Sequence, residues 1–195
     1  MNRVDVLERI ATLRTGAAMI VSPGLANYTL AARGDDPLTL YNMDMPYATP
    51  MALGVALGWP EKKVISIEGD GALLAGPGVL TTVARYKPEN LIVVVFDNAA
   101  YLTTGSGKAP TATAFGTDIE RMGRAAGMKK TRTVNTIDGA KDALRTAFEA
   151  AGPWLIVAKV DKQDRTDRRV SLPVYVYEAG LRFHRAAMKE RGLSK

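Results

Sequence analysis

The sequence predicts an α/β protein in which a doubly wound, mainly parallel sheet carries helices on both faces. Three observations lead to this fold class. Apolar runs of strand length alternate with segments of helical periodicity over most of the chain. The run 91–96 is apolar at every position, as in parallel strands that are covered on both faces. Glycine and polar residues follow several of the expected strands, where the chain has to turn.

Caps and helix breakers set the limits of the elements before residue 60. Asn2 is a candidate N-cap, Pro23-Gly24 ends the first strand, Gly34 ends the second helix, and Pro50 suits the first turn of the third. The expected elements are a helix at 2–15, a strand at 17–22, a helix at 25–33, a strand at 38–41 and a helix from 50 to about 58.

The alternation continues through the rest of the chain. We expect a strand at 63–67, a helix at 73–86, a strand at 91–96, a Gly/Thr/Ala-rich loop at 99–117, a helix at 118–126, a strand at 130–134, a helix at 137–150, a strand at 154–160 and a helix at 178–191. With 195 residues and no internal repeat, the chain suits one domain at 1–161. Residues 162–195 form a tail and helix that we expect to pack on this domain or on a partner subunit.

Composition excludes several classes of site. The chain has no cysteine, so any metal must be bound by oxygen ligands or by the single histidine, His184. Most of the formal charge of +6 lies from Lys159 onward, mixed with aspartates and without stacking aromatics, so no nucleic-acid partner is expected. No apolar run reaches the length of a membrane span, and the first residues do not resemble a secretion signal. These features favour a cytoplasmic protein.

The triplet Gly69-Asp70-Gly71 joins a buried strand to a helix. Glycines allow the backbone to approach a ligand closely, and a helix N-terminus offers N–H groups to a phosphate. An aspartate beside a bare phosphate would be repelled, so its presence indicates a Mg²⁺ between carboxylate and phosphates. Twenty-five residues separate Gly71 from Asp97-Asn98, which follows the next strand, and that strand returns to the same edge of the sheet. Asn98 can add an amide oxygen there.

This paired motif resembles the signature of thiamine-diphosphate enzymes: Gly-Asp-Gly, about 25 residues, then Asp-Asn. The segments 68–74 and 96–105 most resemble the small subunits of sulfopyruvate decarboxylase and the corresponding half of phosphonopyruvate decarboxylase. The resemblance covers nearly the whole chain. It implies the diphosphate-binding domain of the thiamine-diphosphate fold, with thiamine diphosphate and Mg²⁺ as cofactors.

The resemblance also implies residue roles. For the metal, Asp70 and Asn98 would supply side-chain oxygens and Ala100 its backbone carbonyl. For the cofactor, the residues implied are Gly24, Asn27, Met43, Met45, Gly69, Gly71, Ala72 and Tyr101. Gly24–Asn27 and Gly71-Ala72 would line the diphosphate, and the Met43 carbonyl and Met45 side chain would hold the aminopyrimidine end. Tyr101 would pack beneath the metal loop.

The family's activating Glu belongs to a pyrimidine-binding domain, for which this chain has no length. The resemblance therefore implies a second subunit that brings this Glu, so that the catalytic residues of this chain are unknown and the enzyme is a hetero-oligomer. The implied activity is decarboxylation of a small 2-oxo acid. Tyr28 stands where sulfonate- and phosphonate-reading members have an Arg, which favours a less anionic substrate.

Two alternatives remain open. In the first, the chain is the small subunit of another thiamine-diphosphate enzyme, such as a carboligase or a 2-oxo acid oxidoreductase. In the second, it is a non-catalytic regulatory partner that retains the fold. Ala72 in place of a usual Ser and Pro46 in place of a usual Gly support the regulatory alternative. The intact Asp70 and Asn98 oppose it.

Overall fold

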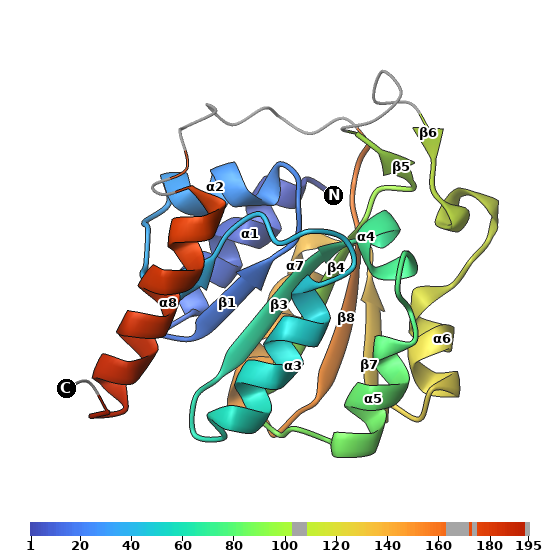
Figure 1. Cartoon of the computed structure of the whole chain (residues 1–195). Helices are drawn as coiled ribbons and strands as arrows, with labels where there is room; N and C mark the ends of the chain where they lie inside the picture. The colour runs from blue at the N-terminus through green and yellow to red at the C-terminus, as the bar shows by residue number, and fades with distance from the viewer. Residues whose placement is uncertain (103–108, 163–171, 173–174, 194–195) are drawn as a thin grey trace.

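The computed structural model describes the chain except for residues 103–108, 163–171, 173–174 and 194–195. A six-stranded parallel sheet in the order β2-β1-β3-β4-β8-β7 forms its centre, which confirms the predicted fold class. The strands are β1 (Ala18–Val21), β2 (Thr39–Leu40), β3 (Val64–Gly69), β4 (Leu91–Asp97), β7 (Lys130–Val134) and β8 (Trp154–Lys159). Figure 1 shows helices in front of and behind this sheet.

Each face of the sheet has its own apolar core. One core contains buried residues of α3 (Ala48–Gly58), α5 (Val79–Tyr86), α6 (Ile119–Ala125) and α8 (Val176–Glu190). The other contains residues of α1 (Arg3–Leu13), α2 (Ala26–Ala32) and α7 (Ile137–Glu149). Along β4, Val93 and Val95 belong to the first core, whereas Ile92 and Val94 belong to the second. This explains why the strand is apolar at every position.

Local sequence accounts for most element ends. The Asn2 side chain accepts a hydrogen bond from the Val4 N–H, as expected of an N-cap. Asp118 and Thr136 cap α6 and α7 in the same way. Pro50 lies in the first turn of α3. The C-terminal helix α8 lies against the β2 side of the domain, where Arg182 pairs with Asp35, Lys62 pairs with Glu190, and Ala179 is buried.

Two predictions about elements were wrong. The single helix expected at 73–86 is two helices, α4 (Asp70–Leu74) and α5. The segment between them contains Gly76, Pro77 and Gly78, and a proline lacks the N–H that a continuous helix needs. The loop expected at 99–117 contains the antiparallel pair β5 (Ala100–Tyr101) and β6 (Ala109–Pro110), followed by the 3₁₀ helix η2 (Ala112–Phe115).

Within the described residues, no helix is both long and apolar enough to cross a membrane.

Candidate functional site

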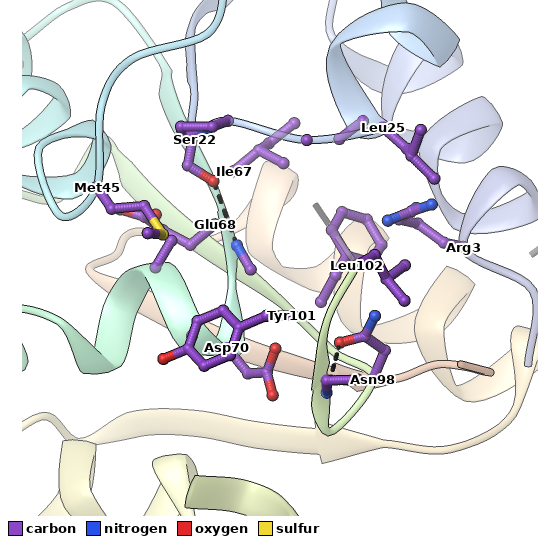
Figure 2. Close-up of a pocket in the computed structure, with 18 residues that line it drawn as sticks. Arg3, Ser22, Leu25, Met45, Ile67, Glu68, Asp70, Asn98, Tyr101 and Leu102 are labelled. Carbon is purple, nitrogen blue, oxygen red and sulfur yellow. Dashed lines mark hydrogen bonds between the residues drawn. The ribbon is translucent and has the colours of Figure 1, made fainter. Parts of the chain in front are cut away.

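A pocket opens where the chain's connections change direction. From β1 the chain crosses over to β2 on one side, whereas from β3 it crosses over to β4 on the other. In open parallel sheets, ligands bind beyond the carboxyl ends of the strands at this switch point. The pocket is lined by residues at the ends of β1, β3 and β4 or just after them, and by Arg3 of α1. Met45 also lines it, from the segment 41–47 between β2 and α3, which we call the Met45 loop. Figure 2 shows these side chains around the pocket.

Asp70 is a buried carboxylate of this pocket, with 2% of its surface exposed. Two hydroxyl groups donate to the same oxygen, Oδ2: Thr111 Oγ1 at 2.5 Å and Thr113 Oγ1 at 2.8 Å. Burial raises the pKa of Asp70, and the nearby charge of Asp97 raises it further, while the two hydroxyl groups lower it. The site therefore concentrates negative charge in a poorly hydrated place, which favours binding of a cation.

Asp97, at the end of β4, is also buried but has its own donors. Its Oδ1 accepts a hydrogen bond from the Ala99 N–H at 3.2 Å and lies 2.8 Å from Thr113 Oγ1, whose single proton it shares with Asp70. Its Oδ2 forms an ion pair with Lys159 at the end of β8. The lysine offsets the charge of Asp97, which does not line the pocket, whereas Asp70 does.

Asn98 follows Asp97 and points its side chain to the same pocket. Its Oδ1 accepts a hydrogen bond from the Ala100 N–H at 3.1 Å, which holds the turn between β4 and β5. Ala99 between them has a φ of 58°, in the left-handed region. This turn brings Asn98 and Ala100 to the pocket beside Asp70, so the three predicted metal-site residues all line one cavity.

Glycines leave the opposite walls of the pocket open. An added Cβ at Gly24 or Gly69 would have no atom within 4 Å. Gly24 also has a φ of 128°, which side-chain-bearing residues rarely adopt. At Gly71 the situation is different, because an added Cβ would lie 2.2 Å from Cε1 of Tyr101. The Tyr101 ring therefore packs directly on the glycine loop and forms part of the pocket wall.

Met45 marks the less enclosed end of the pocket. Its side chain lines the cavity and is 44% exposed, and Tyr47 beside it is 57% exposed. Met43 is half-buried against the core that contains α3 and does not line the pocket. Its N–H donates to the Val21 carbonyl at 2.8 Å, which ties the Met45 loop to the end of β1.

Asn27 was predicted to line the cofactor, but the structure places it behind the pocket. It is 1% exposed, and its Nδ2 donates to the carbonyls of Ser22 and Gly24. Its Oδ1 accepts from the Asn42 N–H at 2.7 Å. These bonds join the turn after β1 to the segment leading to Met45, so Asn27 shapes the pocket without lining it. Gly24, Gly69, Gly71, Ala72, Met45 and Tyr101 do line it.

Glu68 is a pocket residue to which the motif analysis assigned no role. It is 1% exposed, and its Oε1 accepts hydrogen bonds from the N–H and the hydroxyl of Thr49, both at 2.9 Å. Within the described part of the chain, its Oε2 lies within hydrogen-bond geometry of no other group. Burial raises the pKa of Glu68, although the hydrogen bonds from Thr49 and the Ser22 hydroxyl oppose this. No local sequence signal predicts that this carboxyl group lies at the pocket wall and is hydrogen-bonded by Thr49.

Arg3 was also missed, because it is 66 residues before Gly69, the start of the metal motif, and no local pattern links the two. It lies at the start of α1, is 8% exposed and lines the pocket opposite the Met45 loop (Figure 2). Tyr28, which the sequence analysis connected with substrate choice, is not among the residues that line the pocket.

Comparisons with protein families and with known proteins give matches over most of the chain. Residues 26–158 match the family model of the thiamine pyrophosphate enzyme C-terminal TPP-binding domain. The chain is 30% identical to the sulfopyruvate decarboxylase subunit beta of Methanocaldococcus jannaschii, over 89% of this chain and 92% of that one. It is 32% identical to the sulfopyruvate decarboxylase of Methanosarcina acetivorans, over 80% of this chain and 44% of that one. The chain thus spans less than half of this longer relative.

A solved structure shows the same fold. The benzoylformate decarboxylase of Polynucleobacter necessarius superposes with a TM-score of 0.69 at 23% identity, covering 86% of this chain and 34% of that one.

Proposed function

We propose that this chain, which belongs to the thiamine pyrophosphate enzymes as a C-terminal TPP-binding domain, is one subunit of a 2-oxo acid decarboxylase that is built from two subunits. The observation that carries the proposal is the meeting of Asp70 and Asn98 in one glycine-walled pocket at the switch point of the sheet. The relatives named as decarboxylases and as beta subunits support the reaction class and the division into two chains.

The residues present fit a magnesium diphosphate. Asp70, Asn98 and the Ala100 carbonyl would hold Mg²⁺, which prefers oxygen ligands from one or two carboxylates or amides together with phosphate oxygens. Gly24 and Gly69 leave space beside the backbone, where a side chain would otherwise stand. Gly71 and Ala72 would border the diphosphate. When bound, thiamine diphosphate supplies the carbon nucleophile and electron sink that 2-oxo acid decarboxylation needs.

The Met45 end would receive the aminopyrimidine. There the Met45 side chain would pack against the cofactor, and the Met43 carbonyl would accept a hydrogen bond from the amino group of the aminopyrimidine. Apart from Asp70, Glu68 is the only acidic residue among the described residues of the pocket wall. It is engaged by Thr49 and buried, which makes it a poor activating Glu for the pyrimidine ring. We infer that a second polypeptide brings that Glu and covers the Met45 end.

The test is reconstitution with a pyrimidine-domain partner. The chain alone is expected to release negligible CO₂ from 2-oxo acids in the presence of thiamine diphosphate and Mg²⁺, and the two chains together are expected to do so rapidly. The Asp70→Ala complex should assemble and remain inactive. Substantial turnover by the purified chain alone would contradict the need for a partner, and full activity of the Asp70→Ala complex would contradict the metal assignment.

Substrate preference is tested in the same assay. Because Tyr28 replaces a bidentate anion reader, we expect higher kcat/KM for 2-oxo acids without a sulfonate or phosphonate group. Release of an aldehyde identifies a decarboxylase. Appearance of a larger 2-hydroxy ketone in place of the aldehyde would identify a carboligase.

A further inference from the structure

Two threonines of the segment after β6 hold the proposed metal ligand. Thr111, which precedes η2, is 1% exposed, and Thr113 lies within η2. Their hydroxyl groups both contact Oδ2 of Asp70 and lie 3.0 Å from each other. They are separated from Asp70 by 41 and 43 residues of sequence. These hydrogen bonds therefore depend on the tertiary fold and not on the local turn at Asp70.

The direction of these hydrogen bonds follows from counting protons. Each threonine hydroxyl carries one proton and can donate to one acceptor at a time. Thr113 is 2.8 Å from both Asp70 Oδ2 and Asp97 Oδ1, so the two carboxylates compete for it. Asp97 also has Lys159 and the Ala99 N–H as donors. Asp70 has less compensation of its charge, which makes both threonines important to it.

We propose that Thr111 and Thr113 are positioning residues that fix the Asp70 carboxylate for the cation. By holding Oδ2, they stop the carboxylate from rotating about its terminal bond, and Oδ1 becomes the oxygen presented to Mg²⁺. This inference rests on the proposed function, because it assumes that Asp70 binds the metal. Residues that hydrogen-bond a metal ligand typically contribute about 10–100-fold to metal affinity.

The test separates metal affinity from folding. In the full chain assembled with its partner, thiamine diphosphate binding is followed by protein fluorescence while Mg²⁺ is titrated. Thr111→Val and Thr113→Val keep the branched shape and remove the hydroxyl. Each should raise the Mg²⁺ concentration for half-maximal binding by about 10-fold or more. Thr111→Ser and Thr113→Ser retain the hydroxyl and should stay close to the wild type. A merely structural role would not produce this rescue together with an unchanged melting temperature.

Thr117→Val provides the matched control. Thr117 lies just after η2, and no hydrogen bond from its side chain to Asp70 or Asp97 is found within the described part of the chain. Its replacement should leave the Mg²⁺ dependence unchanged. If a valine variant fails to fold, the alanine variant at the same position takes its place in the titration.

The outcomes distinguish this inference from the proposed function. Valine variants with the wild-type Mg²⁺ dependence, alongside an Asp70→Ala variant that has lost binding, would overturn the positioning role and leave the metal site standing. A wild-type complex that binds thiamine diphosphate without any need for Mg²⁺ would overturn both.

Discussion

The two ends of the pocket differ in how completely this chain builds them. At the Asp70 end, Asp70 is 2% exposed and hydrogen-bonded by two hydroxyl groups, and the Asn98 side chain accepts a hydrogen bond from the next turn. At the other end, Met45 and Tyr47 are 44% and 57% exposed. One end is preorganised and the other needs a cover. This difference suits the proposed function, in which this chain would fix the diphosphate while a second chain would close over the Met45 end.

The strongest test of this contrast is removal of the Asp70 charge. Asp70→Asn keeps the shape of the side chain but weakens its interaction with a divalent cation. We expect Mg²⁺-dependent binding of thiamine diphosphate to fall by at least about 100-fold, beyond the usual effect of losing a residue that only supports a ligand. Isothermal titration of the assembled complex measures this. A loss of less than a few-fold would show that Asp70 does not contact the metal.

The glycine loop offers a smaller effect on stability. Gly71→Ala places a methyl group 2.2 Å from the Tyr101 ring, whereas Gly69→Ala in the same motif meets no atom within 4 Å. Overpacking of this kind costs about 1–3 kcal/mol, so Gly71→Ala should lower the free energy of unfolding by that amount. Gly69→Ala serves as the control and should change it much less. Equal denaturation midpoints for the two variants would mean that Tyr101 moves aside without cost.

The pH dependence of stability tests the buried Glu68. Its pKa in the folded chain is raised by burial, so the unfolded chain loses this proton first as pH increases. The contribution of protonated Glu68 to the free energy of unfolding is complete below the pKa of Glu in the unfolded chain. It is lost as the pH rises through the higher pKa of Glu68 in the folded chain. In urea titrations, the stability of the wild type relative to Glu68→Gln should therefore decline with pH across that window.

Asp70, whose pKa is also raised by burial, remains in both proteins and contributes to both curves alike. A constant difference in free energy of unfolding between the wild type and Glu68→Gln would contradict a raised pKa for Glu68.

The smallest effect on stability is expected at Met45. Because this side chain is 44% exposed, Met45→Ala should change the free energy of unfolding by no more than about 0.5 kcal/mol. Its effect should appear in the assembled complex, as weaker binding of thiamine diphosphate at saturating Mg²⁺. A Met45→Leu variant, which keeps apolar bulk, should retain most of the binding. A large loss of stability in Met45→Ala would show that the Met45 end is part of the core.

The sequence predicted the elements that local pattern controls. Continuous apolar runs identified the buried strands, and polar residues at their ends led to the meeting of Asp70 with Asn98, because parallel strands end at one edge. Thr111 and Thr113 were missed because their contacts with Asp70 span about 40 residues, which no periodicity encodes. Asn27 was predicted to contact the cofactor because the family resemblance covers its position. The direction of its side chain depends on a hydrogen bond from Asn42 in another segment, which the local sequence does not reveal.

The strand order has a consequence for folding. Ser22, Asp70 and Asn98 follow β1, β3 and β4, which lie side by side although α2, β2 and α3 separate the first two along the chain. No short fragment can hold these residues together, and the pocket exists only after three parallel strands have paired. Parallel pairing with long crossovers is slow to form. A ligand that binds this pocket therefore selects the completely folded chain, and its binding energy should raise the melting temperature of the whole domain and not of one segment.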